Sequence, residues 1–341
     1  MLKRHLFFIL LSFSLLALTF STLDTHPFYL PQNWPKPSYN FKGNPLDVEK
    51  FKLGRALFYD PILSRDSSIS CSTCHLQYTA FTHVDHPTSH GIDGRVGKRN
   101  SPSLANLAWR NDFHWDGGVL NLNSQAINPI THHDEMDITL DEVLRRLDHS
   151  PIYAPAFEKT FGTKDIRPFH LVKALAQYTV ALVSANAKYD QVMRKEEGVQ
   201  FSEQELKGYN LFKQNCISCH SGPTLGGDLF KANGLSLNPE LKDFGRMTIT
   251  GKAKDSLLFR VPSLRNIEYS FPYMHDGRYK KLKDVLDHYA HLEDKQVLSK
   301  ELKRKKLNLS SNDQKDLIAF LKTLSDKQFL FDDRFKYAPL K

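Results

Sequence analysis

Apolar residues recur at helical spacing along most of this chain, whereas the alternating pattern typical of strands is rare. The clearest helical stretch, LDVEKFKLGRALF, follows Asn44 and Pro45, which are a typical cap and first-turn pair. The pattern therefore predicts a helix that leads towards residue 70. Its apolar positions fall largely on one side: Val48, Phe51, Leu53, Ala56 and Leu57.

Three residue pairs with the spacing of a capping box mark further helix starts. A longer and more buried helix is predicted over FHLVKALAQYTVALVSANAKY, and a last helix over NDQKDLIAFLKTL. The three pairs are Thr139 with Glu142, Ser202 with Glu205, and Ser311 with Gln314, and the last helix has an apolar stripe of Leu317, Phe320, Leu321 and Leu324.

The first 22 residues differ in composition from the rest of the chain. Lys3 and Arg4 precede an apolar run over residues 6–20, and small and hydroxyl residues follow it. This order predicts a secretory signal peptide over residues 1–22 and export to the periplasm. An uncleaved N-terminal anchor is the alternative, because the residues around Ser21 match a cleavage site only weakly. The run is at the short end for a membrane span, and nothing comparable follows it.

The remaining chain of about 320 residues can form one large domain or two ordinary ones, and two are favoured. The formal net charge of +8 falls to +6 without the leader, since Lys3 and Arg4 are lost with it. This mild surplus is spread through mixed stretches such as KELKRKKL, which are typical of solvated helix faces. The sequence has no zinc-finger or other nucleic-acid motif, so we predict no nucleic-acid partner.

All four cysteines lie in two copies of one pattern, CSTCH at 71–75 and CISCH at 216–220. Two disulfides, or one zinc site with four cysteine ligands, would leave the histidine of each copy without a role. C-x-x-C-H is the attachment signature of c-type haem, in which two thioethers hold the porphyrin and the histidine is an axial iron ligand. The spacing predicts two haem c groups, one on Cys71, Cys74 and His75 and one on Cys216, Cys219 and His220.

Helix signals flank both motifs, as an α-helical haem fold requires. We predict a mainly α fold of two cytochrome c-like haem domains that pack against each other, with long irregular loops. The first spans residues 45–195, with its last helix packing back on it, and the second spans residues 200–325. The segment 76–126 is poor in helix signals and rich in His, Gly, Asp and Asn, so we predict that it forms the wall of a haem pocket.

Long ordered blocks of this sequence resemble the bacterial dihaem cytochrome c peroxidases, particularly their MauG-like branch. The resemblance covers nearly the whole mature chain. In that family the N-terminal haem is the peroxidatic one, and the C-terminal haem takes in and stores an electron. The blocks are LGRALFYDPILSRDSSISCSTCH, RNSPSLANLAW, WDGGVLNLNSQAINPITHHDEM, GRMTITG and FRVPSLRNIEYSFPYMHDGRYKKLKDVLDHYAHL.

The resemblance implies roles for residues outside the two motifs. Glu135 matches the distal acid–base glutamate, and Gln125 and Pro129 match other residues on the distal face. Trp115 matches the tryptophan on the electron path between the haems. Asn100 and the backbone of Ser270 and Pro272 match the ligands of a calcium ion between the domains, a hard cation that accepts oxygen donors.

Two positions depart from the pattern of peroxidases that need reductive activation. Their loop histidine, which closes the peroxidatic iron, falls on Ile92, with His90 two residues away as the alternative. The resemblance therefore implies a first haem that is open at rest. The methionine ligand of their second haem falls on Tyr289, as in MauG-like proteins, with Met274 and His288 as alternatives.

The residues alone leave three of these assignments open. Glu135 could simply favour the start of the helix near Thr139, where an acid meets the positive end of the helix dipole. Trp115 could be an ordinary core residue. Tyr289 shares a helical face with Leu282 and Leu286, which also fits a buried aromatic side chain.

The main functional prediction is a periplasmic dihaem peroxidase that reduces hydrogen peroxide to water, with electrons from a small cytochrome c or a copper protein. A second prediction is a MauG-like oxidase that oxidises residues of a partner protein. A third is a dihaem electron carrier without catalysis. Proteins of this family commonly dimerise, so the resemblance also implies a homodimer.

Overall fold

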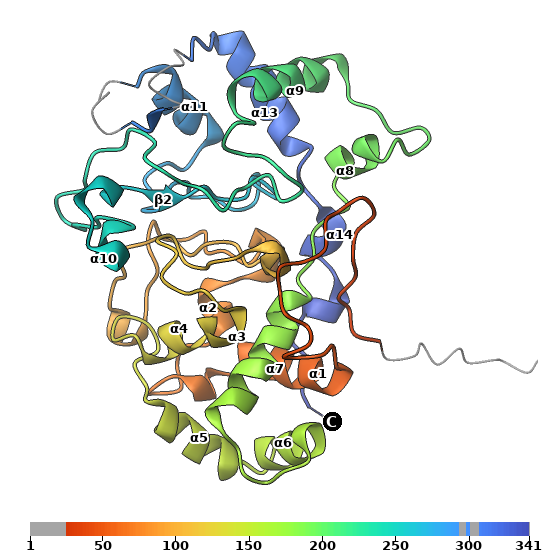
Figure 1. Ribbon diagram of the computed structural model, residues 1–341, viewed down its shortest axis with the longest axis vertical. Helices are drawn as coiled ribbons and strands as arrows, with labels where there is room; N and C mark the ends of the chain where they lie inside the picture. Colours follow the sequence, from red (N-terminus) through yellow and green to blue (C-terminus); the bar gives the residue numbers. More distant parts are fainter. Residues whose placement is uncertain (1–24, 293–297, 301–306, 341) are drawn as a thin grey trace, which may run out of the picture.

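The computed structural model describes residues 25–292, 298–300 and 307–340, so the predicted signal peptide at 1–22 lies outside the described residues. Figure 1 shows two helical lobes, the first half of the chain forming the lower one and most of the second half the upper one. The fold is mainly α, as predicted. Its one sheet in the described residues is a two-stranded antiparallel pair of β1 (Phe230–Lys231) and β2 (Phe259–Arg260).

The helices are short and separated by long irregular segments. The first half contains α1 (Val48–Tyr59), α2 (Cys71–Cys74), α3 (Leu122–Gln125), α4 (Ile127–Thr131), α5 (Leu140–Asp148), α6 (Tyr153–Phe161) and α7 (Pro168–Val180). The second half contains α8 (Lys188–Met193), α9 (Glu203–Asn215), α10 (Met247–Thr250), α11 (Leu282–Ala290), α13 (Ser311–Lys322) and α14 (Lys327–Leu330). Single 3₁₀ turns are η1 (Pro61–Leu63), η2 (Gln77–Thr79), η3 (Ile92–Gly94), η4 (Leu107–Trp109), η5 (Ala253–Asp255) and η7 (Asp333–Phe335).

Each lobe contains a helix pair that crosses at a glycine. In the lower lobe α1 packs on α7, and a Cβ built on Gly54 would lie 1.9 Å from the carbonyl oxygen of Ala174. In the upper lobe α9 packs on α13, and a Cβ on Gly208 would lie 1.9 Å from the carbonyl oxygen of Asp316. Only glycine allows backbones this close. The two lobes therefore share one construction, with the first helix of each pair leading into a C-x-x-C-H motif.

Each helix pair closes a hydrophobic cluster. The lower cluster is the larger and includes Leu53, Leu57 and Tyr178, all fully buried. The upper cluster is smaller, and the predicted stripe of α13 lies inside it, which confirms the expected face of that helix. The buried residues of the upper cluster are Phe212, Leu225, Ile267, Leu286, Leu317, Phe320, Leu321 and Leu324.

Two predicted helix starts are confirmed. Thr139 caps α5, where its hydroxyl accepts a hydrogen bond from the Glu142 N–H. Ser202 caps α9, and Glu205 completes the capping box by accepting from the Ser202 N–H at 2.7 Å.

The predicted start of α1 at Asn44 and Pro45 is wrong. Asp47 caps the helix instead, with its carboxylate accepting from the Lys50 N–H at 2.8 Å. The Asn44 side chain is buried, and its amide donates to the Tyr39 hydroxyl and the Lys173 carbonyl. This tertiary contact takes up the side chain that would otherwise cap the helix.

The start of α13 is also shifted from its prediction, by one residue. Ser310 caps the helix and forms the capping box with Asp313. The predicted partner Gln314 is buried and bonds to the side chain of Asp287 in α11.

The long helix predicted over residues 169–189 is shorter in the structure. It ends as α7 at Val180, and α8 begins only at Lys188. The reason is Asn106, whose side chain accepts from the Ser184 N–H and donates to the Ser184 carbonyl, at 2.9 and 3.0 Å. These bonds take the backbone groups that would have continued the helix.

Segments from both ends of the chain tie the lobes together. The Phe335 carbonyl, beyond α14, accepts hydrogen bonds from the hydroxyls of Tyr59 and Tyr178 in the lower lobe, both at 2.8 Å. Near the other end, the Trp34 ring packs edge-on against Trp109 of the lower lobe and under the guanidinium of Arg265 in the upper one. The last residues of the chain thus belong to the lower lobe (Figure 1).

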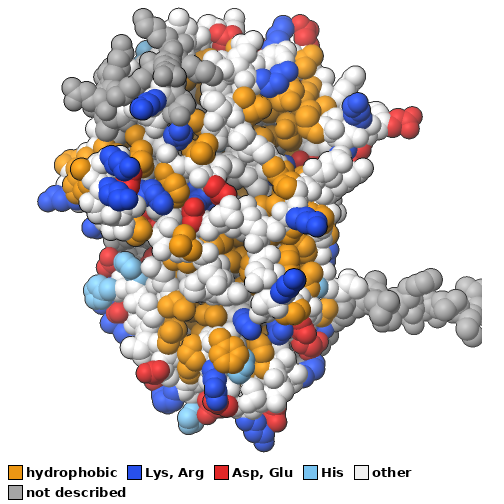
Figure 2. All heavy atoms as spheres, in the orientation of Figure 1, with side chains coloured by type: hydrophobic (Ala, Val, Ile, Leu, Met, Phe, Trp, Pro, Cys, Tyr) orange, Lys and Arg blue, Asp and Glu red, His pale blue; other side chains and the backbone are white. Residues whose placement is uncertain are grey.

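The surface shows no single basic region on the face drawn in Figure 2. Lys and Arg side chains are spread over both lobes and are interspersed with acidic and apolar ones. Among the described residues, no helix has the length and hydropathy that a bilayer span requires.

The glycine crossings predict a specific loss of stability. Alanine is normally the better helix former by up to about 1 kcal/mol, but Gly54→Ala or Gly208→Ala would force two helices apart. We expect each variant to lower the free energy of unfolding by about 1–3 kcal/mol, measured by urea titration of the haem-loaded protein. Gly43→Ala is the matched control, because its new Cβ meets nothing nearer than 3.5 Å. Unchanged stability in the first two variants would refute the close crossing.

Candidate dihaem site

Both C-x-x-C-H motifs form the same single helical turn. The His75 N–H donates to the Cys71 carbonyl at 3.0 Å, and the His220 N–H donates to the Cys216 carbonyl at 2.9 Å. This turn brings the two cysteines and the histidine of each motif close together. All four cysteines are free thiols, so the disulfide alternative does not hold.

Each motif histidine is oriented by a backbone carbonyl a few residues later. The Nδ1 atom of His75 donates to the Phe81 carbonyl at 2.8 Å, and that of His220 to the Leu225 carbonyl at 3.2 Å. Because a carbonyl only accepts, the proton sits on Nδ1 and the lone pair of Nε2 is free to bind iron. Burial lowers the pKa of both rings to about 4, so both are neutral, as iron ligands must be.

One cavity of about 730 Å³ connects the two motifs. Its walls come from both lobes and include much of the loop segment 76–126, where a pocket wall was predicted. Most of the predicted site residues line it: Cys74, His75, Asn100, Trp115, Gln125, Pro129, Glu135, Cys216, Cys219, His220, Ser270, Pro272, Met274 and Tyr289.

The donor set of this cavity fits two haem c groups. It offers free cysteine thiols next to neutral histidines, each with Nε2 available, at the two ends of one large and mainly apolar space. Within residues 25–292, 298–300 and 307–340, no group of three or more His, Cys, Asp or Glu side chains could hold a metal ion. A four-cysteine zinc site therefore does not form.

Glu135 lies at the end of the cavity near the first motif. Its backbone is fixed by two bonds, since its N–H donates to the His132 carbonyl and its carbonyl accepts from the Ile92 N–H, at 3.0 and 2.9 Å. Burial raises the pKa of its carboxyl, and Asp134 raises it further, while His132 partly opposes the shift. The first turn of α5 contains Asp141 and Glu142 instead. Glu135 thus faces the cavity and not the helix start.

Gln125 and Pro129 lie on two short consecutive helices beside Glu135. Gln125 ends α3 and Pro129 is inside α4. The Pro129 carbonyl accepts from the Met136 N–H at 3.1 Å, which ties α4 to the turn that carries Glu135. The three side chains therefore share one wall of the cavity.

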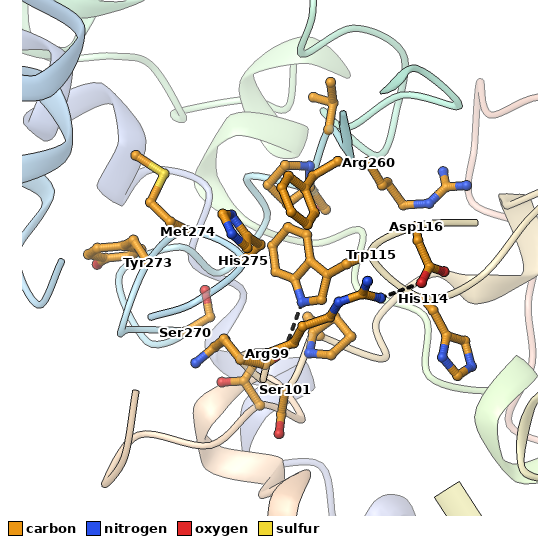
Figure 3. A pocket seen from close by; sticks show the side chains of 18 of the residues that line it. Arg99, Ser101, His114, Trp115, Asp116, Arg260, Ser270, Tyr273, Met274 and His275 are labelled. Carbon is orange, nitrogen blue, oxygen red and sulfur yellow. Dashed lines mark hydrogen bonds and ion pairs between the residues drawn. The ribbon is translucent and has the colours of Figure 1, made fainter. Parts of the chain in front are cut away.

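Trp115 lies at the boundary between the lobes. Figure 3 shows its indole at the centre of the cavity wall, near His275 and Arg99. Its Nε1 donates to the Asn100 carbonyl at 2.8 Å, and its own carbonyl accepts from the Arg260 N–H at 2.8 Å. Trp115 is buried but belongs to neither hydrophobic cluster. Simple core packing therefore does not describe it.

Three candidate ligands of the second haem gather around Asn233. The Asn233 side chain donates to the Met274 sulfur at 3.4 Å and bonds to the Tyr289 hydroxyl. Its backbone carbonyl is bonded to Nε2 of His288 at 2.9 Å, so that nitrogen is occupied. Tyr289 and Met274 line the cavity, whereas His288 does not. Burial raises the pKa of Tyr289 to about 12, the hydrogen bond with Asn233 opposes this shift, and the nearby Cys216 adds to it.

The three predicted calcium ligands share another part of the wall. The Asn100 N–H donates to the His275 carbonyl at 2.7 Å, which joins the loop from the lower lobe to the segment that carries Ser270 and Pro272. The Asn100 Nδ2 donates to the Pro87 carbonyl at 3.0 Å. The Oδ1 atom of Asn100 therefore points away from the Pro87 carbonyl.

The loop after the first motif presents no histidine to the cavity from either candidate position. Ile92 is 1 % exposed, and its N–H is held by the Glu135 carbonyl. The ring of His90 packs against that of His86, with centroids 4.0 Å apart, and His90 is not among the residues that line the cavity.

Comparison with known proteins agrees with this geometry. Residues 48–198 match the family of di-haem cytochrome c peroxidases, and residues 205–325 match the cytochrome c family. The chain is 37% identical to the methylamine utilization protein MauG of Methylorubrum extorquens over 308 residues, which covers 87% of this chain and 83% of that protein. It is 32% identical to the cytochrome c551 peroxidase of Nitrosomonas europaea, covering 83% of this chain and 82% of that protein.

Among solved structures, a MauG-like protein associated with microbial copper homeostasis superposes with a TM-score of 0.81. It is 31% identical, and the match covers 90% of this chain and 97% of that one. The chain belongs to the dihaem cytochrome c peroxidase family. It is an oxidoreductase that acts on peroxide, and its cofactors are two haem c groups.

Two residues that shape the site of this dihaem peroxidase were not found from the sequence. Asn233 contacts all three candidate ligands of the second haem but lies in an irregular segment without a motif. Arg99 joins the lobes by donating to Asp116 and to both oxygens of Asp243. A sequence signal exists only for Arg99, which stands directly before Asn100 in RNSP.

Proposed function

We propose that this dihaem peroxidase reduces one hydrogen peroxide to two water molecules, using two protons and two electrons from a small cytochrome c or a copper protein in the periplasm. Cys71, Cys74 and His75 would hold the first haem, and the second motif would hold the other. Bound there, the first haem supplies the iron at which the oxygen–oxygen bond breaks, and the second supplies a site for electron uptake. The buried carboxyl of Glu135 beside the first motif is the observation that carries this proposal.

Glu135 is assigned the proton transfer. A carboxylate can take a proton from one peroxide oxygen and return it to the oxygen that leaves. Its raised pKa makes it a better base than an exposed carboxylate, and the two backbone bonds hold the turn from which the side chain projects. Gln125 and Pro129 complete this wall and limit the space beside the carboxyl.

Peroxide would meet an open first site without prior reduction. The aliphatic Ile92 offers no ligand atom, and the His90 ring is packed on His86. Both observations favour a site opposite His75 that the protein leaves free at rest.

The region between the motifs would serve electron transfer and domain docking. Trp115 is assigned to the electron path, because it is buried at the boundary and hydrogen bonded to both lobes. A calcium ion bound by Asn100 Oδ1 and the carbonyls of Ser270 and Pro272 would hold the same boundary together. A homodimer is proposed as the assembly in solution.

Tyr289 is assigned as the axial ligand of the second haem opposite His220. It lines the cavity, lies near Cys216 and is held by Asn233. A phenolate ligand favours ferric iron and lowers the potential relative to a methionine ligand. Met274 is the alternative on the same wall.

Oxidation of a partner protein, as a MauG-like oxidase, is the second candidate function. It is favoured by tyrosine at position 289 and by the 37% identity to MauG. An electron carrier without catalysis is disfavoured, because it would need both irons closed and the wall opposite His75 offers no ligand from Ile92 or His90.

The role of Glu135 predicts a selective loss of activity. Glu135→Gln should keep the haem spectrum but cut peroxide turnover by about 10²- to 10⁴-fold, because the amide cannot accept the proton. In the parent, turnover should fall as pH drops through the raised pKa of this carboxyl, and the variant should lose that dependence. The exposed Glu158→Gln is the control and should turn over normally. Undiminished turnover in Glu135→Gln would remove this residue from the mechanism.

The ligand assignment predicts a spectroscopic change in one haem. Tyr289→Phe removes the phenol oxygen, so the electron paramagnetic resonance signal of the second haem should change while the high-spin signal of the open first haem persists. Tyr279→Phe, at a tyrosine near His288, is the control and should leave both signals intact. Identical spectra for the parent and Tyr289→Phe would instead favour Met274 as the ligand.

The peroxidase and the MauG-like oxidase differ in the source of the electrons that reduce peroxide, which is a small donor protein for the first and residues of a partner protein for the second. A peroxidase should consume peroxide only with a reduced small cytochrome c or copper protein present, oxidising two donor molecules per peroxide. Stopped-flow absorbance of the donor measures this ratio. Sustained peroxide consumption without a donor, accompanied by oxidation of a partner protein, would establish the oxidase instead.

A further inference from the structure

Arg110 is a charged residue in the cavity that the proposed mechanism does not use. It directly follows the 3₁₀ turn η4, and its N–H donates to the Leu107 carbonyl at 3.1 Å. Its side chain lines the cavity. The guanidinium forms no hydrogen bond or ion pair with the part of the chain that the structure describes. Burial lowers its pKa, and only the charge of Asp228 acts in the opposite direction.

The other arginines of the cavity are paired with carboxylates. Arg99 donates to Asp116 and Asp243, with the Nε–Oδ2 distance to Asp243 at 2.6 Å. Arg260 contacts Asp112 and lies 3.3 Å from Asp228. Of the three arginines that line the cavity, Arg110 therefore differs in having no carboxylate within hydrogen-bonding distance in the described residues.

The burial of Arg110 carries a cost that Asp228 offsets only in part. The pKa of Arg260 is lowered to about 9, first by burial and then by the positive charge of Arg110. Two like charges near each other in a buried space repel, and a buried charge without a hydrogen-bonded anion is unfavourable. A further anion in the cavity next to Arg110 would offset the part of this cost that Asp228 does not.

The cofactors of this family bring such anions, because each haem carries two propionate carboxylates. We propose that Arg110 binds a propionate of one of the two haems. The planar guanidinium matches a carboxylate in a two-point hydrogen bond, which a lysine ammonium does less well. Nothing in the C-x-x-C-H motifs specifies this contact.

The surroundings of Arg110 favour the second haem as the source of the carboxylate. Asn111, the next residue, bonds to Asp228. Arg260 donates to the carbonyl of Gly227 at 3.2 Å, and a Cβ on Gly227 would lie 3.4 Å from the Cys219 carbonyl. This chain of contacts ends at the second motif, which favours a propionate of the second haem as the partner of Arg110. A propionate of the first haem is the alternative, since it carries the same carboxylate group.

The test is a redox titration of the haem-loaded protein, followed by absorbance with the two haems distinguished by their spin states. In Arg110→Gln the midpoint potential of the haem that Arg110 contacts should fall, because a nearby cation disfavours the more positive ferric state. Arg110→Lys keeps the charge and should restore most of the potential. The exposed Arg145→Gln should leave both potentials unchanged.

The outcome is independent of peroxide turnover, so it does not depend on the proposed function. A shift confined to the low-spin haem assigns the contact to the second site, and a shift confined to the high-spin haem assigns it to the first. Loss of one haem in Arg110→Gln with retention of both in Arg110→Lys also supports the contact. Two unchanged potentials in Arg110→Gln, or equal effects of both substitutions, would overturn it.

Discussion

The hydrogen bond from each motif histidine to a backbone carbonyl is the constraint on which both haem sites depend. It places the proton on Nδ1, turns Nε2 into the cavity and holds the ring against rotation. Both acceptor carbonyls, of Phe81 and Leu225, belong to residues with positive φ, so the chain turns sharply after each motif. The glycine crossings at Gly54 and Gly208 then place a helix pair beside each turn.

Both motifs present the histidine ligand in the same way. The two haem sites can therefore differ only in the residues on the side of the cavity away from His75 and His220. Near the first motif the cavity is lined by the carboxyl of Glu135, and Ile92 is buried behind it, with its N–H bonded to the Glu135 carbonyl. Near the second motif, Asn233 contacts the side chains of Tyr289 and Met274, the two candidate ligands that line the cavity. A haem with an open iron suits a reacting site, and a haem with two protein ligands suits an electron-transfer site, so the proposed ligands would give the two sites different tasks. The same local fold can therefore hold two haems with different tasks.

The local parts of this arrangement could be predicted from the sequence, and the long-range parts could not. The motif at 216–220 and the capping box at Ser202 act within one helical turn, so their patterns are visible in the chain. The end of α7 depends on Asn106, whose contact with Ser184 spans 78 residues and leaves no local signal. Glu135 and Trp115 were reached only through the resemblance to a family, since a lone acid or tryptophan has several ordinary uses.

The contacts at the boundary between the lobes tie the position of the Trp115 indole to the relative position of the lobes. Trp115 belongs to the lower lobe, yet its carbonyl is held by Arg260 of the upper one. Its indole is held by Asn100, whose own N–H reaches the upper lobe at His275. Any rotation of one lobe would break one of these bonds and move the indole. The same few contacts that dock the lobes thus determine where the indole lies between the two sites.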